Sequence, residues 1–218
     1  MVVVVTGGDP VDEAHLPVLP PGTRVIAADS GVEHAHALGL AIDVAIGDFD
    51  SVSPEGLARA AAEGAEVHRH PTAKDATDLE LALDAALALR PARIHVLGGH
   101  GGRLDHLLAN ALVLAAPAYV TTDITAQMGP AHVTVVRSAS SLTGPMGDLV
   151  SLVPVHGVAV GVRTTGLLYP LVGEDLHPGS TRGISNELVA EHATVTIARG
   201  VLLAIQPGQI GTHHQEIR

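Results

Sequence analysis

Aspartates recur where short apolar segments of this 218-residue chain end, and carboxylates at such places can bind a cation or accept a proton. The aspartates concerned are Asp29, Asp48, Asp50, Asp75, Asp78 and Asp105. Carboxylates that lie close together raise one another's pKa unless a cation neutralises them. Their oxygen atoms favour a hard ion such as Mg²⁺ or Ca²⁺, so the pattern predicts a metal site.

Each of these acids also has a structural interpretation, because Asp is common at the N-terminus of a helix. Asp78, which follows Thr77 at a predicted helix start, could serve only that purpose. The repetition of acids at successive segment ends favours the metal site over a set of independent caps.

A glycine-rich run, Gly98–Gly102, lies between an apolar segment and Arg103. Glycines let the backbone approach a ligand closely, and the guanidinium of Arg103 suits a phosphate or a carboxylate. The run matches neither the GxxxxGK[ST] phosphate loop nor the GxGxxG dinucleotide fingerprint. It therefore indicates an anion-binding turn without identifying the ligand.

The first half of the chain alternates short β-branched segments with longer Ala/Leu-rich ones. The predicted strands are Val2–Thr6, Arg24–Ala28, Ile42–Ile46 and Arg93–Leu97. The predicted helices are Val32–Leu38, Pro54–Glu63, Asp78–Leu89 and Leu104–Ala115. This alternation is typical of a parallel sheet covered by helices, in which ligands bind at the carboxyl ends of the strands. Helix starts are expected at Ser30 with Glu33 and at Thr77 with Glu80, both capping boxes, and at Ser53-Pro54.

The helical period disappears after about residue 125, and short strands separated by Gly, Pro and Ser follow. These strands are His132–Arg137, Leu149–Pro154, Val158–Thr164, Ala193–Ala198 and Val201–Gln206, the last two joined in a predicted hairpin through Arg199-Gly200. We therefore predict a Rossmann-like α/β domain with a parallel sheet over residues 1–125. A small antiparallel β-sandwich over residues 126–218 would follow it.

Composition excludes several classes of protein. The net charge of −11 and an aromatic content of 1% argue against nucleic-acid binding, which needs basic surfaces and stacking platforms. With no Cys, the chain has no disulfide or thiolate zinc site. No apolar run approaches the roughly 18 residues of a membrane span, and the first residues lack a signal-peptide pattern. We expect no membrane association and a cytoplasmic location.

Five sequence blocks, taken together, resemble the thiamine pyrophosphokinase family. Three are acidic: Ile46–Ser51, Lys74–Leu83 and Gly101–His106. Two lie in the second half, Thr164–Leu171 and Gly183–Glu187. They follow the family's order and span nearly the whole chain, with an α/β half before a β half.

The resemblance implies transfer of a pyrophosphoryl group from ATP to the hydroxyl of thiamine, giving thiamine diphosphate and AMP. It implies Mg²⁺ as the cofactor and a homodimer with sites between subunits. By matching position, it implies Asp48, Asp50 and Asp78 as metal ligands that together with Asp105 form the catalytic set. The implied ATP-binding residues are Asp29, Lys74, Asp75, Thr77 and Arg103, and Ser185 and Asn186 would bind thiamine.

One feature departs from the family pattern. Some relatives stack an aromatic side chain on the thiamine rings, whereas this chain has no Trp and no aromatic residue after Tyr169. Two alternatives stay open: a binding module for nucleotides or thiamine phosphates without turnover, and a pyrophosphokinase for another small alcohol such as a pterin. All the acids of the three blocks are present, which favours the thiamine enzyme.

Overall fold

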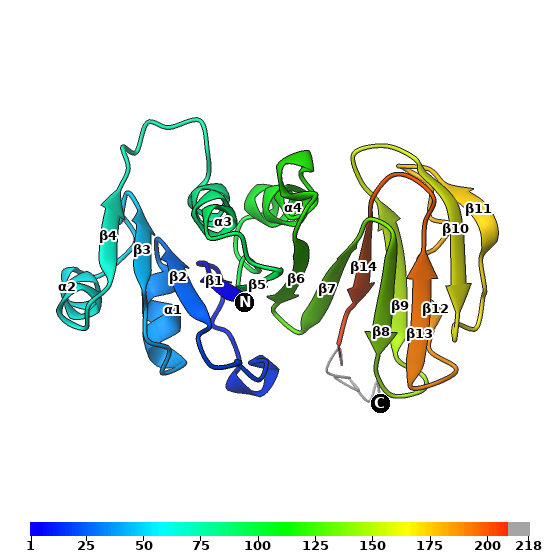
Figure 1. The fold of residues 1–218 in the computed structure, drawn as a ribbon, viewed down its shortest axis with the longest axis horizontal. Coiled ribbons are helices and arrows are strands. Elements are labelled where there is room, and N and C mark those ends of the chain that lie inside the picture. Colours follow the sequence, from blue (N-terminus) through cyan, green and yellow to red (C-terminus); the bar gives the residue numbers. More distant parts are fainter. Residues whose placement is uncertain (209–218) are drawn as a thin grey trace, which may run out of the picture.

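The computed structural model describes residues 1–208, and a ten-stranded sheet runs through it from one side to the other (Figure 1). Its strands from the first half of the chain are β1 (Val2–Val5), β2 (Arg24–Ala28), β3 (Val44–Gly47), β4 (Glu66–Arg69), β5 (Arg93–Leu97) and β6 (Asp123–Met128). These six are mutually parallel, in the order β4-β3-β2-β1-β5-β6.

Helices cover both faces of the parallel part because successive strand residues point to opposite sides. Val3 and Val5 pack with α1 (Gly31–Ala37) and α2 (Pro54–Ala62). Val2 and Val4 pack with α3 (Asp78–Ala88), and α4 (Leu104–Val113) covers the same face. Short 3₁₀ turns, Glu13–His15 and Pro117–Tyr119, complete this half. None of the helices within residues 1–208 has the length and apolar character needed to cross a membrane.

The second half continues the large sheet and adds another. Strands β7 (Ala131–Val136), β9 (Leu149–Pro154), β12 (Asn186–Glu187) and β14 (Leu202–Gln206) extend it with antiparallel pairing. The separate antiparallel sheet has the order β11-β10-β13-β8 and consists of β8 (Ala139–Thr143), β10 (Ala159–Thr165), β11 (Val172–Leu176) and β13 (His192–Thr196). One apolar core contains residues of both, such as Leu152 and Leu202 with Val162 and Val195. The fold is thus a large, mostly parallel sheet with helices followed by an antiparallel sheet.

The predicted hairpin between residues 193–198 and 201–206 is wrong. β13 pairs with β8 and β10, whereas β14 pairs with β7 and β9, in the other sheet. Val195 and Leu202 both enter the common core, so the chain crosses from one sheet to the other between them. Alternation predicted both strands, but it does not say which strand each one pairs with.

Two of the three predicted helix starts have the expected cap. Thr77 Oγ1 accepts a hydrogen bond from Glu80 N at 3.2 Å, and Ser53 Oγ accepts one from Gly56 N at 2.9 Å. Ser30 makes no capping bond, because its own backbone is already helical (φ −58°, ψ −9°). Glu33 accepts hydrogen bonds from Ser53 instead and ties α1 to the start of α2.

A buried histidine makes folding sensitive to acid. His95 in β5 is 5% exposed, its Nδ1 lies 2.7 Å from Thr125 Oγ1, and its ring stacks on His132. Burial lowers the pKa of His95 to about 4. An unfolded His titrates near 6.5, so between pH 6.5 and 4 the unfolded chain binds more protons than the folded one.

We therefore expect stability to fall as pH drops through this window, by at most about 1.4 kcal/mol per pH unit from this residue. The urea midpoint of the wild type should fall more steeply between pH 6.5 and 4 than that of His95→Asn. Parallel pH profiles for the two proteins would contradict this role of His95.

Candidate active site

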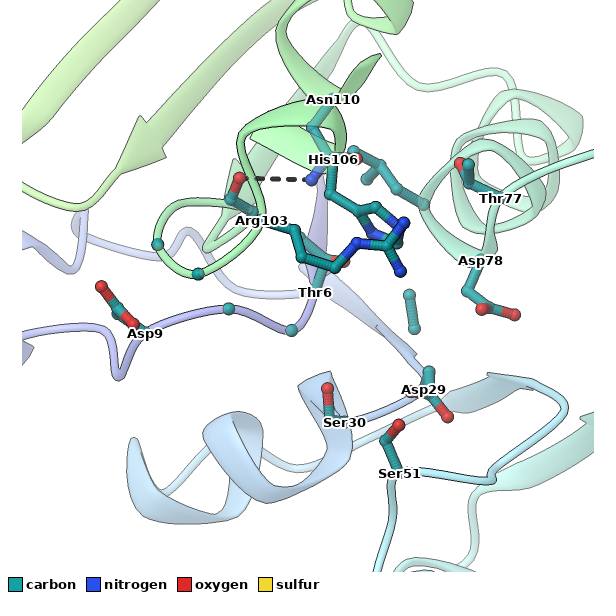
Figure 2. A pocket seen from close by; sticks show the side chains of 17 residues that line it. Thr6, Asp9, Asp29, Ser30, Ser51, Thr77, Asp78, Arg103, His106 and Asn110 are labelled. Carbon is teal, nitrogen blue, oxygen red and sulfur yellow. Dashed lines mark hydrogen bonds between the residues drawn. The ribbon is translucent and has the colours of Figure 1, made fainter. Parts of the chain in front are cut away.

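A cavity of about 460 Å³ opens at the carboxyl ends of β1, β2 and β5 (Figure 2). Its walls come from residues 6–9 after β1, residues 28–30 at the end of β2, residues 77–79 at the start of α3, and the segment 99–110. Ser51 completes it. All of these segments belong to the first half of the chain. The cavity lies at the carboxyl ends of the strands, where the positions of the acids in the sequence predicted a site.

Two glycine-rich loops form one side of the cavity. Asp9 N donates to His100 O and Gly99 N donates to Gly7 O, both at 2.7 Å, so the loops after β1 and β5 lie against each other. Gly8 (φ +115°) has no room for a Cβ because it would strike the His100 carbonyl. The loop after β1 was not predicted as part of the site, although its Gly7-Gly8-Asp9 directly after a buried strand was a usable signal.

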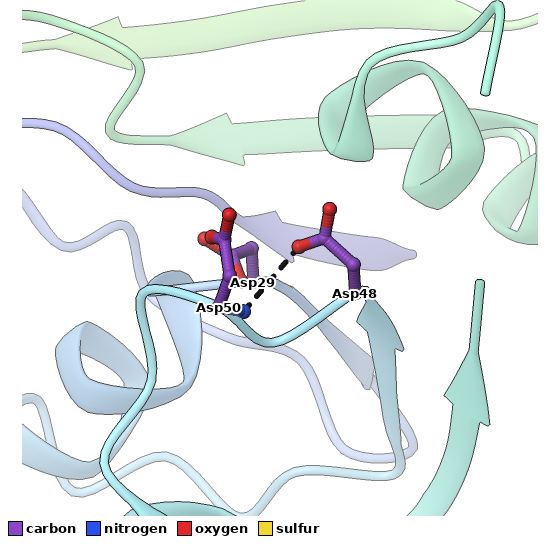
Figure 3. A group of neighbouring side chains, drawn as sticks. All are labelled: Asp29, Asp48 and Asp50. Atoms are coloured by element: carbon purple, nitrogen blue, oxygen red, sulfur yellow. Dashed lines mark hydrogen bonds between the residues drawn. The ribbon is translucent and has the colours of Figure 1, made fainter. Parts of the chain in front are cut away.

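Three predicted acids come together beside this cavity (Figure 3). Asp29, Asp48 and Asp50 can place one carboxylate oxygen each within 4.8 Å of one another. The tight turn between the last two depends on Phe49, which takes a positive φ of 61° and is only 8% exposed. The ring of Phe49 packs in the apolar core, while the carboxylates of Asp48 and Asp50 lie close to that of Asp29.

The electrostatics of these acids suit a cation. Burial raises the pKa of Asp29, and the charges of Asp78, Asp50 and Asp48 raise it further. Partial desolvation acts against ionisation of Asp48, but hydrogen bonds from Asp50 N and Lys74 outweigh it and lower the pKa of that carboxyl. Asp29 Oδ1 is buried and has no hydrogen-bond partner within residues 1–208. An oxygen-preferring divalent ion would satisfy this atom and neutralise its neighbours, so the donor set fits Mg²⁺.

Lys74 links Asp78 to the cluster formed by Asp29, Asp48 and Asp50. Lys74 Nζ lies 2.6 Å from Asp78 Oδ1 and 3.3 Å from Asp48 Oδ2. Asp78 also lines the cavity, as does Thr77, whose side chain caps α3. Asp75 is exposed and is not among the residues that line the cavity.

Arg103 and Asp105 form an exposed ion pair at the rim. The Arg103 guanidinium donates to both oxygens of Asp105, at 3.2 and 2.6 Å, and lowers the pKa of Asp105 to about 2. Arg103 lines the cavity together with His106 and Asn110, neither of which was predicted as a site residue (Figure 2). An anionic ligand would have to displace Asp105 from the guanidinium of Arg103 or bind to the guanidinium together with Asp105.

The structure does not bring Ser185 and Asn186 to this cavity within one chain. Ser185 is exposed, with a positive φ of 55°. Asn186 is 4% exposed, and its amide is used by the backbone of Tyr169: Nδ2 donates to the carbonyl at 2.8 Å and Oδ1 accepts from the N–H at 3.0 Å. Asn186 therefore braces the neighbouring segment, and contact of either residue with thiamine stays a prediction.

Hard oxygen donors beside glycine-rich loops, at the carboxyl ends of parallel strands, suit a divalent cation together with a phosphate-bearing ligand. Residues 21–126 match the model of the thiamin pyrophosphokinase catalytic domain, and residues 133–202 match that of the thiamin pyrophosphokinase vitamin B1 binding domain. The thiamine pyrophosphokinase of Bacillus subtilis is 30% identical over 194 residues, which cover 84% of this chain and 87% of that protein.

Solved structures agree with these matches. That of the Bacillus subtilis thiamine pyrophosphokinase has a TM-score of 0.82 and 29% identity, covering 96% of this chain and 99% of that one. The Geobacillus thermodenitrificans enzyme gives 0.80 and 28%, with 97% and 99% covered. The chain belongs to the thiamine pyrophosphokinase family. It is an ATP-dependent pyrophosphotransferase that converts thiamine into thiamine diphosphate.

Proposed function

We propose that this enzyme holds Mg²⁺–ATP at the acidic edge of the large sheet. Asp48 and Asp50 would be metal ligands, and the unpartnered oxygen of Asp29 makes that residue a third. Asp78, which the family pattern implies as a ligand, borders the same space but is paired with Lys74. The observation that carries the assignment is the approach of Asp29, Asp48 and Asp50 to within 4.8 Å.

The nucleotide would lie along the cavity wall. Backbone N–H groups of the two glycine-rich loops can approach phosphate oxygens closely, and Arg103 offers a bidentate fork. Thr77 lines the cavity at the start of α3, and Lys74 contacts Asp78, which also lines it; Asp75 lies between Lys74 and Thr77 in sequence. These assignments follow the family's motifs, and the geometry supports Arg103 and Thr77 most directly because both line the cavity.

Pyrophosphoryl transfer requires alignment and charge neutralisation more than covalent help from the protein. Bound Mg²⁺ would neutralise charge on the phosphate oxygens. The carboxylates hold and orient the reacting groups, and one of them accepts the proton of the thiamine hydroxyl. Arg103, held by Asp105, would face the anionic groups at the rim.

We further propose that the working enzyme is a homodimer whose second half supplies the thiamine site in trans. Helix α4 exposes Leu104, Leu108 and Leu112, which lie four residues apart on one face, at 68%, 55% and 43%. The second half exposes Tyr169 and Ile184 near Ser185. In a two-fold dimer, each of these apolar patches can pack against the other patch of the partner chain, so that both are buried on both chains.

We also propose that the chain divides into two functional units. Residues 1–125 form a Rossmann-like unit for ATP and the metal, and residues 126–218 a β-sandwich for thiamine, with residues 209–218 outside the described part. Helices on both faces of parallel strands support the first, and the core between two antiparallel sheets supports the second. The boundary falls within β6, so the units share one sheet. Use of ATP suggests the cytoplasm as the location.

Incubation of the purified protein with ATP, Mg²⁺ and thiamine should yield thiamine diphosphate and AMP in equal amounts. A hydroxymethyl pterin in place of thiamine serves as the competing substrate. Nucleotide binding without AMP formation would favour a binding module, and faster turnover of the pterin would favour the other pyrophosphokinase reaction.

A further inference from the structure

Lys74 is the only lysine among the 218 residues, since every other Lys/Arg position is an arginine. It lies in residues 70–77, the connection between β4 and α3 that carries no helix or strand. Its side chain is only 14% exposed although the segment is on the surface. A single lysine in a chain that otherwise uses arginine, placed where its charge is largely hidden, indicates a need for its particular chemistry.

The ammonium of Lys74 joins two acids from different elements. Asp48 follows β3 and Asp78 begins α3, and Lys74 Nζ lies 3.3 and 2.6 Å from their carboxylates. Gly47 makes room for this approach, because a Cβ there would lie 3.1 Å from Asp78 Oδ1. Lysine is a compact point charge with rotatable donors, whereas arginine's planar fork favours pairing with one carboxylate. The lysine therefore bridges the acids much as a small cation would.

We infer that Lys74 and Mg²⁺ exchange on Asp48 and Asp78: the ammonium holds the two carboxylates together and withdraws when the metal takes their oxygens. The inference rests on the proposed metal site. It accounts for the difference between the acid triad seen in the fold, which includes Asp29, and the family pattern, which includes Asp78. A withdrawn Lys74, on its flexible stem, is then free to bind a phosphate group as a point charge.

Because Lys74 is unique, an amine-selective acetylating reagent can report its exposure in the wild-type protein. Acetylation of Lys74, followed by mass spectrometry, should be several-fold faster with Mg²⁺ alone than with KCl of equal ionic strength. The α-amino group of the chain serves as the internal reference. An unchanged rate, under conditions where Mg²⁺ raises the melting temperature, would overturn the exchange but leave the metal site standing. No thermal response to Mg²⁺ would overturn both.

Variants separate competition from simple loss of charge. Lys74→Met should need about ten-fold less Mg²⁺ than the wild type for half of the maximal rise in melting temperature, measured without ATP or thiamine. Lys74→Arg, which keeps the charge but favours pairing with one carboxylate, should need an amount of Mg²⁺ between those of Lys74→Met and the wild type. Equal Mg²⁺ requirements in Lys74→Met and the wild type would show that the lysine and the metal do not compete. If Lys74→Met does not fold, the acetylation experiment still decides.

Discussion

The Asp48→Asn variant is expected to lose roughly 10³-fold in kcat while keeping its fold. Asp48 belongs both to the acid triad seen in the fold and to the ligand set of the family pattern, and its oxygens lie next to Asp50 N and Lys74 Nζ. Asparagine preserves the shape but removes the charge, and its amide group turns donor N–H toward the cation. The stability change should stay near 1 kcal/mol, since only one ion pair and one hydrogen bond are weakened.

Steady-state kinetics at saturating Mg²⁺, together with a thermal melt of each protein, test this expectation. Asp123→Asn is the matched control, because Asp123 is an exposed acid at the start of β6 and lies outside the cavity. A normal kcat for Asp48→Asn would remove Asp48 from the site. A collapsed melting temperature would instead assign it to the fold.

Mixing two inactive variants is expected to restore activity, provided that the site is shared between subunits. Asp48→Asn disables the metal site in the first half, and Ile184→Glu places a charge beside Ser185 in the second. In a randomly reassembled mixture about half of the dimers are mixed, and each of these has one site with both halves intact. The mixture should therefore recover about a quarter of wild-type activity.

The co-expressed pair, carrying different tags and purified through both, contains only mixed dimers and should recover about half of wild-type activity. Asp48→Asn combined with Asp50→Asn is the control, because both changes lie in the same half and no mixed dimer has an intact site. Absence of recovery in mixed dimers whose assembly is demonstrated would place each complete site within a single chain.

The sequence predicted the four helices and most of the longer strands, but it missed β4, β6, β8, β11 and β12. β4 escaped notice because Glu66, His68 and Arg69 are exposed on an edge strand and give no apolar signal. The wrong hairpin has a different cause: β13 and β14 each have the right pattern, but pairing across sheets depends on the whole core. For the same reason the sequence did not show that one sheet continues from the first half into the second. The helical period ends near residue 125, which predicts a domain boundary there, but β6 lies within the large sheet.

The sequence predicted the part of the site whose residues directly follow the parallel strands. Asp29, Asp48 and Asp50 converge because parallel strands end at the same edge. Side-chain pairing is decided by contacts that no spacing rule contains. Neither the contact of Lys74 with Asp48 nor the use of the Asn186 amide by Tyr169 was visible in the sequence.

The passage of β6 between β5 and β7 bears on how such an enzyme could arise or be divided. A gene split near codon 125 would cut a central strand and leave each fragment with an open sheet edge, which attracts other chains. Recognition of the nucleotide and of the vitamin would therefore be inherited together. Neither half is a module that recombination could move to another protein without rebuilding that strand.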